Sequence, residues 1–301
     1  MRENKMNRPL LSIVIANYNY GRFLDEAIQS VLNQSCQDFE LIVCDAASND
    51  NSVEIITKYA HGLPPNAQLT DSNQPLASKI SWWCSEKDGG QSAAFNKGFA
   101  RARGRFLTWL NADDVFLPGV VASLKKVVEQ EPDCEWFVGG SLWLDPQMRV
   151  LHCHPCREFS QLRYQYGHVS VWGPSSFFSK RILLAAGGVD ERFHYKMDTD
   201  LWLKFAKMGY RYRPFKEYAF GLRLHPDGKM SGHEFAESEL ANPGHPKWKQ
   251  LRRENEWIEE VVSVRKMGPL SRFTTMGIWP VMRGLIDDFR FRGKTYKDLF
   301  I

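Results

Sequence analysis

Short, mainly apolar runs alternate with segments of helical periodicity through the first half of the chain. Three of the runs suit strands that are buried on both faces of a sheet: residues 10–16, 39–44 and 105–110. Between them, residues 23–32, 52–59 and 92–103 repeat apolar side chains at the spacing of an α-helix. This alternation predicts an α/β fold with a mainly parallel sheet, flanked by helices and joined by right-handed crossovers.

The second half of the chain is less regular. Residues 117–130 have a helical pattern, and residues 135–144 suggest two short strands. Residues 62–80 are rich in Pro, Asn and Ser, which is typical of a loop. Beyond residue 150, the pattern predicts helices that begin near residues 180 and 199.

Polar or acidic residues follow three of the predicted strands. Asn17 and Tyr18 come after the first, Asp45 after the second, and Asp113 with Asp114 after the third. In an open parallel sheet the carboxyl ends of the strands meet at one edge, where ligands bind. Adjacent carboxylates there suit Mg²⁺ or Mn²⁺, which take few protein oxygens and complete their shell with phosphate and water. Helix caps and turns are the simpler alternative for the same residues.

Two common nucleotide-binding motifs are missing from the sequence. It contains neither a G-x-G-x-x-G after the first strand nor a G-x-x-x-x-G-K-[ST] loop, which disfavours Rossmann dehydrogenases and P-loop NTPases. Residues 152–156 (HCHPC) have the side chains of a zinc site, but no second Cys pair stands at finger spacing. A structural zinc site is therefore the less favoured interpretation.

Composition is that of an ordinary globular protein, with 43% hydrophobic and 25% charged residues. The six cysteines are scattered along the chain, which favours reduced thiols over a disulfide framework. The first residues lack the apolar core of an export signal, and no run approaches about 18 apolar residues. We therefore expect a cytoplasmic protein without a transmembrane helix.

The net charge of +4 comes from the C-terminal part of the chain. Residues 245–301 hold 12 Lys and Arg against 7 Asp and Glu, a balance of +5, and the remaining 27 basic and 28 acidic residues give −1. Because this segment also carries Phe, Trp, Met, Ile and Leu, it predicts peripheral contact with anionic lipid at the inner face of the plasma membrane. Packing against its own domain or another subunit is the alternative. Nucleic acid is not an expected partner.

Four ordered motifs resemble glycosyltransferase family 2. They are residues 12–19 (SIVIANYN), 45–50 (DAASND), 85–90 (SEKDGG) and 110–114 (LNADD). Two later stretches extend the resemblance to roughly residue 230. Residues 197–204 (MDTDLWLK) are similar to the family's acidic motif before an aromatic-rich helix, and 222–225 (LRLH), with Lys229 and Ser231, to a closing basic motif.

The resemblance implies a GT-A fold, which is a Rossmann-like, mainly parallel sheet flanked by helices, here with a C-terminal helical appendage. It implies a glycosyltransferase domain over about residues 8–235. The nucleotide-binding half would be about 8–150 and the acceptor half about 151–235. Residues 236–301 would form a basic helical extension.

The resemblance also assigns the donor site. Ala16, Asn17, Tyr18 and Asp45 would contact the nucleotide, with Asp45 accepting an N–H of the base. Asp88 would face the base or ribose. Phosphate oxygens would be held by Arg223 or Lys229.

Metal and catalytic roles follow in the same way. Asp113 and Asp114 would bind Mn²⁺ or Mg²⁺, with Asp114 preferred as the direct ligand and His225 closing the site. Asp198 would be the general base on the acceptor hydroxyl, with Asp200 capping or orienting its helix.

Three positions depart from the family pattern. Asn111 stands where the metal motif usually begins with an acid, Ala46 where glycine is usual, and Met197 where Glu often precedes the base. The first of these departures leaves only two carboxylates in the metal motif.

The implied activity is inverting transfer of a sugar from a nucleoside diphosphate sugar to a glycan or lipid-linked acceptor, in surface polysaccharide or glycolipid synthesis. Two other classes stay open. A catalytically silent nucleotide- or glycan-binding subunit would not need the carboxylates that are present. A nucleotidyltransferase would need a Gly-rich, Lys-bearing loop after the first strand, which residues 17–21 (NYNYG) do not supply.

Overall fold

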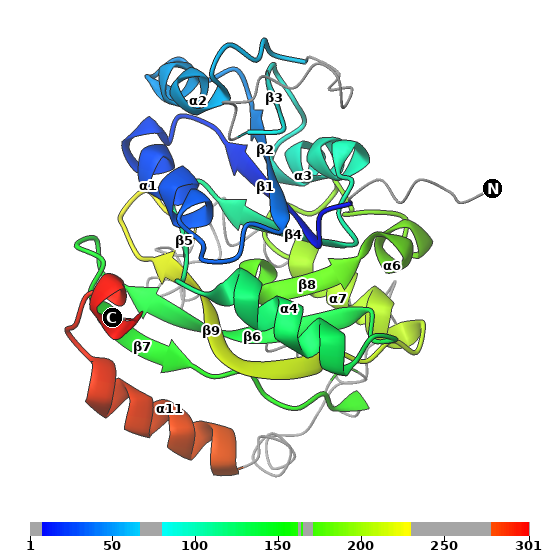
Figure 1. Ribbon diagram of the computed structural model, residues 1–301, viewed down its shortest axis with the longest axis vertical. Coiled ribbons are helices and arrows are strands. Elements are labelled where there is room, and N and C mark those ends of the chain that lie inside the picture. The colour runs from blue at the N-terminus through cyan, green and yellow to red at the C-terminus, as the bar shows by residue number, and fades with distance from the viewer. Residues whose placement is uncertain (1–7, 67–79, 162–163, 165–170, 230–277, 301) are drawn as a thin grey trace, which may run out of the picture.

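The computed structural model describes residues 8–66, 80–161, 164, 171–229 and 278–300. Within them, nine strands form one sheet in the order β3-β2-β1-β4-β8-β6-β9-β5, and β7 pairs with β6. Four strands at one end of the sheet are parallel (Figure 1): β1 (Leu11–Asn17), β2 (Phe39–Asp45), β3 (Trp82–Ser85) and β4 (Phe106–Asn111). Three of these, β1, β2 and β4, lie within one residue of the predicted bounds.

The other five strands make the sheet mixed rather than mainly parallel. They are β5 (Val115–Phe116), β6 (Trp136–Leu144), β7 (Val150–His154), β8 (Ser176–Ser179) and β9 (Arg213–Arg223). Only β9 runs parallel to its neighbour β6, while the β4–β8, β6–β8, β6–β7 and β5–β9 pairs are antiparallel. A short link such as residues 145–149 permits only antiparallel pairing. The α/β fold class is confirmed, but β6 is one strand rather than two.

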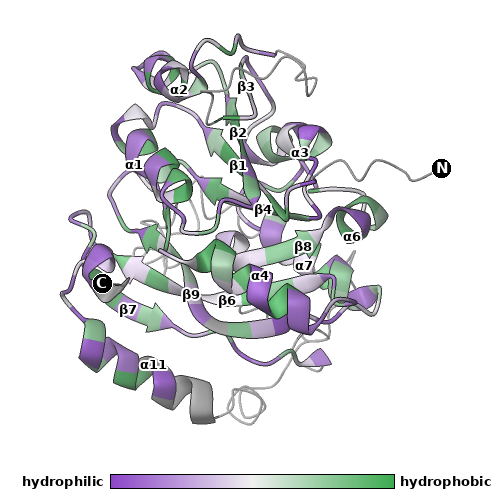
Figure 2. Ribbon diagram, in the orientation of Figure 1, coloured by the Kyte–Doolittle hydropathy of each residue, from purple (hydrophilic) through white to green (hydrophobic). Residues whose placement is uncertain are grey.

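Helices cover both faces of the sheet. On one face lie α1 (Gly21–Leu32), α2 (Ser52–Ala60) and α4 (Val120–Gln130), and on the other α3 (Gln91–Arg101), α6 (Lys180–Ala185) and α7 (Met197–Lys207). Side chains of β1 alternate between the two cores, with Ile13 and Ile15 in the first and Val14 in the second. Burial on both sides explains why these strands are almost wholly apolar (Figure 2).

Helix α3 lies very close to β1. A Cβ atom on Gly98 would be 2.3 Å from Cγ1 of Val14, so only glycine allows this approach without a shift of the helix. The approach matters for function because α3 begins at the edge of the sheet where β1 and β4 end.

The C-terminal helix α11 (Ile278–Phe291) packs beside β7 (Figure 1). After it, Arg149 and Thr295 form a β-bridge, and a short 3₁₀ helix, η2 (Tyr296–Phe300), ends the described chain. The predicted extension is thus helical over its described part, whereas residues 236–277 lie outside the described residues. Among the helices described, none is long and apolar enough to cross a membrane.

All six cysteines are free thiols. In the described part of the chain, no group of three or more His, Cys, Asp or Glu residues is placed to hold a metal ion. The HCHPC stretch contributes no such group. Cys153 instead lies beside α11, with its backbone N–H donating to Asp288.

Candidate active site

A cavity of about 470 Å³ opens where β1 and β4 end and α3 begins. We call it the central cavity. Eight of the eleven residues predicted for the site line it: Ala16, Asn17, Tyr18, Asp88, Asp113, Asp114, Arg223 and Lys229. The other three, Asp45, Asp198 and His225, are not among its lining residues. Segments far apart in sequence therefore meet at one edge of the sheet, as expected for a parallel α/β core.

Asp45 is fully buried behind the cavity wall. Its Oδ1 accepts from Asn17 Nδ2 (2.7 Å) and from the Ser48 hydroxyl (2.5 Å), and its Oδ2 accepts from the Ser48 N–H (3.0 Å) and the Ser85 hydroxyl (2.6 Å). A carboxylate has about four lone-pair sites, so these contacts leave none for the predicted bond to a base N–H. In this position Asp45 ties together the ends of β1, β2 and β3.

Asn17 lines the cavity and is only 4% exposed. Because the Asp45 carboxylate can only accept, it fixes the amide with Nδ2 turned toward Asp45. The Oδ1 atom is buried and has no hydrogen-bond partner. Asn17 therefore offers an acceptor in a fixed orientation at the end of β1.

A second acceptor without a partner belongs to Asp88. Its Oδ1 accepts the N–H of Gly90 (2.8 Å), while Oδ2 is buried without a hydrogen bond. Gly90 has φ +106, a conformation that side chains disfavour, and it immediately precedes α3. The turn thus holds the Asp88 side chain at the cavity wall.

The two carboxylates of the metal motif differ in their surroundings. Asp114 is 1% exposed, and its oxygens accept the Arg223 backbone N–H (3.1 Å) and the Asn111 Nδ2 group (2.8 Å). Burial, together with the neighbouring Asp113 carboxylate, raises the pKa of Asp114 well above its usual range. Asp114, which the sequence predicted as the direct metal ligand, is therefore the more enclosed of the two carboxylates. Asn111 donates a hydrogen bond to it, which a carboxylate at position 111 could not do.

Asp113 faces His225, with 3.1 Å between Oδ2 and Nε2. The imidazole packs against Phe23, at 4.6 Å between ring centroids, and edge-on against Tyr20 at 5.7 Å. Its Nδ1 is buried without a hydrogen bond. His225 thus lies behind Asp113 rather than on the cavity wall.

The donor set of this pair suits a hard or borderline divalent cation. The Asp113 carboxylate and the His225 imidazole, 3.1 Å apart, are the two groups that would hold such an ion. A carboxylate oxygen and an imidazole nitrogen are ligands that Mn²⁺ accepts. With only two protein ligands, the remaining positions would fall to a diphosphate and water.

Arg223 donates hydrogen bonds to both aspartates, Asp113 and Asp114. Its guanidinium forms an ion pair with Glu26 (2.6 Å) and donates to the backbone oxygen of Asp113 (3.1 Å). Its partner Glu26 could not be predicted from the sequence, because Glu26 lies 197 positions away in α1. Arg223 reaches the cavity but is already committed to these partners.

Lys229 is the second predicted cation of the site. Its Nζ donates to Gln91 Oε1 (2.8 Å) and to the backbone oxygen of His194 (3.1 Å). Gln91, His194 and Lys87 also line the cavity, and sequence reasoning missed all three. A signal existed for two of them, because Lys87 lies within the DGG-containing motif and Gln91 directly follows it.

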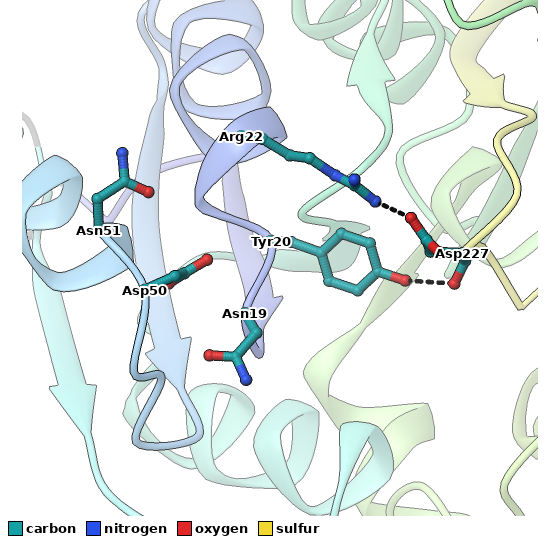
Figure 3. Close-up of a pocket in the computed structure, with 6 residues that line it drawn as sticks. All are labelled: Asn19, Tyr20, Arg22, Asp50, Asn51 and Asp227. Carbon is teal, nitrogen blue, oxygen red and sulfur yellow. Dashed lines mark hydrogen bonds and ion pairs between the residues drawn. The ribbon is translucent and has the colours of Figure 1, made fainter.

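The segment that carries His225 and Lys229 is fastened to α1 by Asp227. Figure 3 shows the side chains of Tyr20 and Arg22 pointing to Asp227, where Tyr20 donates to the backbone oxygen (3.0 Å) and Arg22 forms an ion pair with the carboxylate. Burial and nearby carboxylates raise the pKa of Tyr20 to about 12, so the phenol remains a donor at neutral pH. Tyr20 also lines the central cavity.

Asp198 lies in the first turn of α7, four positions after the lining residue His194. It is half-buried, and its Oδ1 accepts the N–H of Thr199 (2.6 Å). Burial raises the pKa of Asp198. Asp200 points elsewhere, because it is fully buried and forms an ion pair with Lys204 at 2.6 Å.

Comparison with known proteins identifies the class of this fold. The S. aureus protein TarS, solved with UDP, superimposes with a TM-score of 0.53 at 15% identity, covering 91% of this chain and 77% of that one. The mannosyltransferase PcManGT from Pyrobaculum calidifontis, in complex with GDP-Man and Mn²⁺, gives a TM-score of 0.52 at 16% identity, covering 94% and 80%. The fold is that of the GT-A glycosyltransferases.

Sequence comparison adds a family model and several relatives to this structural likeness. The family model "Glycosyl transferase family 2" matches residues 12–140. An uncharacterized glycosyltransferase of Methanocaldococcus jannaschii is 26% identical over 73% of this chain and 72% of its own length. The hyaluronan synthase of Pasteurella multocida is 24% identical over 75% of this chain, but that match spans 22% of the synthase. Over residues 12–140 the chain is thus similar to glycosyltransferase family 2, and its relatives support a glycosyltransferase.

Proposed function

We propose that this chain transfers a sugar from a nucleoside diphosphate sugar to an acceptor hydroxyl, with inversion at the anomeric carbon and with the help of Mn²⁺ or Mg²⁺. The observation that carries the proposal is the central cavity, whose wall combines acceptor atoms, acidic groups and two lysines. UDP, UDP-GlcNAc and GDP-Man are bound by proteins of this fold. A glycan or lipid-linked acceptor in surface polysaccharide or glycolipid synthesis is the matching context.

In the proposed donor complex, the nucleotide lies along the ends of β1 and β3. Of the described residues that line the cavity, Asn17 and Asp88 carry buried acceptors without hydrogen-bond partners, and these suit a base N–H and a ribose hydroxyl. The diphosphate lies toward Lys229 and Lys87, whose ammonium groups attract its charge. Asp45 acts through Asn17 and Ser48 and does not touch the base.

Asp113 and His225 are the residues that would hold the metal ion, with Asp114 orienting Asp113 from behind. When bound, the ion would neutralise the charge that develops on the departing diphosphate. Arg223 holds the Asp113 backbone and the Asp114 carboxylate in place. Because Asp114 is enclosed by two protein donors, we assign it a positioning role rather than direct ligation.

Asp198 is the proposed general base. It accepts the proton of the acceptor hydroxyl while the acceptor oxygen bonds to the anomeric carbon and the bond from that carbon to the diphosphate breaks. A raised pKa makes a carboxylate a stronger base, and such catalysis contributes about 10²–10⁴-fold in rate. An acceptor between His194 and the start of α7 would come within reach of this side chain.

A panel of nucleotide sugars tests the proposal. Thermal shift with UDP-, GDP- and dTDP-sugars, with and without Mn²⁺, should show stabilisation by one class of donor, because a ligand that binds only the native state raises its stability. With that donor, NMR of the released sugar or product should show inverted anomeric configuration. Retained configuration would refute the inverting mechanism, and binding without any turnover would favour the silent subunit.

A further inference from the structure

Helix α11 turns its acidic residues toward the domain. Asp287 accepts a hydrogen bond from the Tyr218 hydroxyl of β9. Asp288 accepts the backbone N–H of Cys153 in β7 and lies 3.7 Å from Nδ1 of His152. These contacts fix the rotation of the helix about its own axis, so the opposite face is defined as well.

That opposite face is apolar. Leu285 is 60% exposed, Ile286 55% and Phe289 94%. Leu285 and Phe289 are four positions apart and therefore adjacent on the helix surface. An amphipathic helix of a globular protein normally shows the reverse, with its apolar stripe on the core. Half of the exposed large hydrophobic residues in the described chain, three of six, lie on this single helix.

Basic residues border the apolar face. Arg290, Arg292 and Lys294 are exposed at the end of α11 and just beyond it. Asp287 and Asp288 of the same segment face the strands, and Asp298, which is exposed, is the remaining acid. The outer surface of this segment is thus apolar and positively charged.

We propose that α11 docks on an anionic lipid surface, with Leu285, Ile286 and Phe289 entering the interface and Arg290, Arg292 and Lys294 at the headgroups. Apolar side chains beside cations are the combination that anionic bilayers bind. A symmetric contact between two copies of this chain fits less well, because it would supply no anionic partner for Arg290, Arg292 and Lys294. The proposal rests on α11 and the residues directly after it, and it does not depend on the proposed function.

The docking surface is linked to the central cavity by few residues. Tyr296, which is buried just after α11, donates its hydroxyl to Glu26 at 3.4 Å. Glu26 is the ion-pair partner of Arg223 on the cavity wall. A lipid surface bound at α11 would therefore hold the cavity at a defined place relative to the membrane.

Vesicle flotation of the full chain tests the proposal. The protein should float with vesicles of phosphatidylcholine and phosphatidylglycerol, much less with phosphatidylcholine alone, and binding should weaken as salt shortens the Debye length below about 8 Å. The double variant Leu285→Ser/Phe289→Ser should bind at least about tenfold more weakly, and Arg290→Gln/Arg292→Gln should lose the preference for phosphatidylglycerol.

The matched control is Leu184→Ser, because Leu184 is 68% exposed on the distant helix α6. It should bind vesicles like the unaltered chain, and all variants should keep the same melting temperature because the changed side chains are exposed. The proposal is overturned if the unaltered chain does not float. It is also overturned if Leu184→Ser weakens binding equally, or if gel filtration shows that the α11 variants instead abolish a dimer.

Discussion

His225 Nε2 lies 3.1 Å from Asp113 Oδ2, across 112 positions of the chain. The contact joins the loop after β9 to the residues that follow β4. It also distinguishes Asp113 from its neighbour Asp114, whose oxygens bond to Arg223 and Asn111. The different roles proposed for Asp113 and Asp114 at the metal site follow from this difference.

Asp113→Asn should raise the Mn²⁺ concentration needed for half-maximal activity by about tenfold or more, because a ligand is lost. Its melting temperature should change little. Asp114→Asn should act on stability instead. The new amide would place an NH₂ group against one of the two donors that Asp114 now accepts, at a cost of about 1–3 kcal/mol. Activity titrations with Mn²⁺ and thermal melts separate the two effects, and the reverse pattern would contradict the assignment.

Asp198→Asn should lower kcat by about 10²–10⁴-fold and leave donor affinity unchanged, because only the proton acceptor is removed. Stopped assays for kcat and calorimetry for the donor give the two quantities. Asp200→Asn is the control, since Asp200 is paired with Lys204 and should affect stability more than kcat. Equal loss of kcat and donor affinity in Asp198→Asn would argue against the role of base.

The pH profile provides an independent check on Asp198. A general base must be ionised, and burial raises the pKa of this carboxyl while Lys196 opposes the shift. As the pH is lowered, the activity should therefore begin to fall at a pH above the ordinary Asp pKa of about 3.9. In Asp198→Asn this acid limb should disappear from the residual kcat/KM profile. An unchanged limb would assign it to another group.

Asn17→Leu should remove recognition of the base N–H. For the nucleoside diphosphate that binds best, methylation of the ring nitrogen should weaken binding to the unaltered chain by about tenfold, the value of one good hydrogen bond. In Asn17→Leu the methylated and unmethylated ligands should bind equally. Calorimetry with both ligands measures the ratio. A variant that binds both more weakly but keeps the ratio would show that Asn17 acts only on structure.

Gly98→Ala should lower the free energy of unfolding by about 1–3 kcal/mol, because the new Cβ would overlap Val14. Gly89→Ala is the control, since its Cβ would meet Ala93 at 3.5 Å and Glu191 Oε2 at 4.0 Å, which are ordinary contact distances. Urea titration measures both, and the midpoint should shift without a change in slope. Equal midpoints for the two variants would show that α3 moves away from β1 at little cost.

The sequence by itself determined the nucleotide side of the fold. Periodicity identified β1, β2 and β4 and the helices between them, because strands buried on both faces are apolar throughout and their helices carry an apolar stripe. The motifs at the strand ends then placed Asn17, Asp88, Asp113 and Asp114 at a common edge. These signals are local, so one sequence is enough to read them.

Only the tertiary structure decided which atoms are available at that edge. Asp45 and Asp114 are typical ligand residues in sequence, yet Ser85 and Arg223, which lie 40 and 109 positions away, donate to their oxygens, while Asn17 Oδ1 has no hydrogen-bond partner. The strands β8 and β9 and the orientation of α11 escaped prediction for the same reason. Their partners lie far away in the chain, and hydrogen bonding and burial are settled by the side chains that the complete fold brings together.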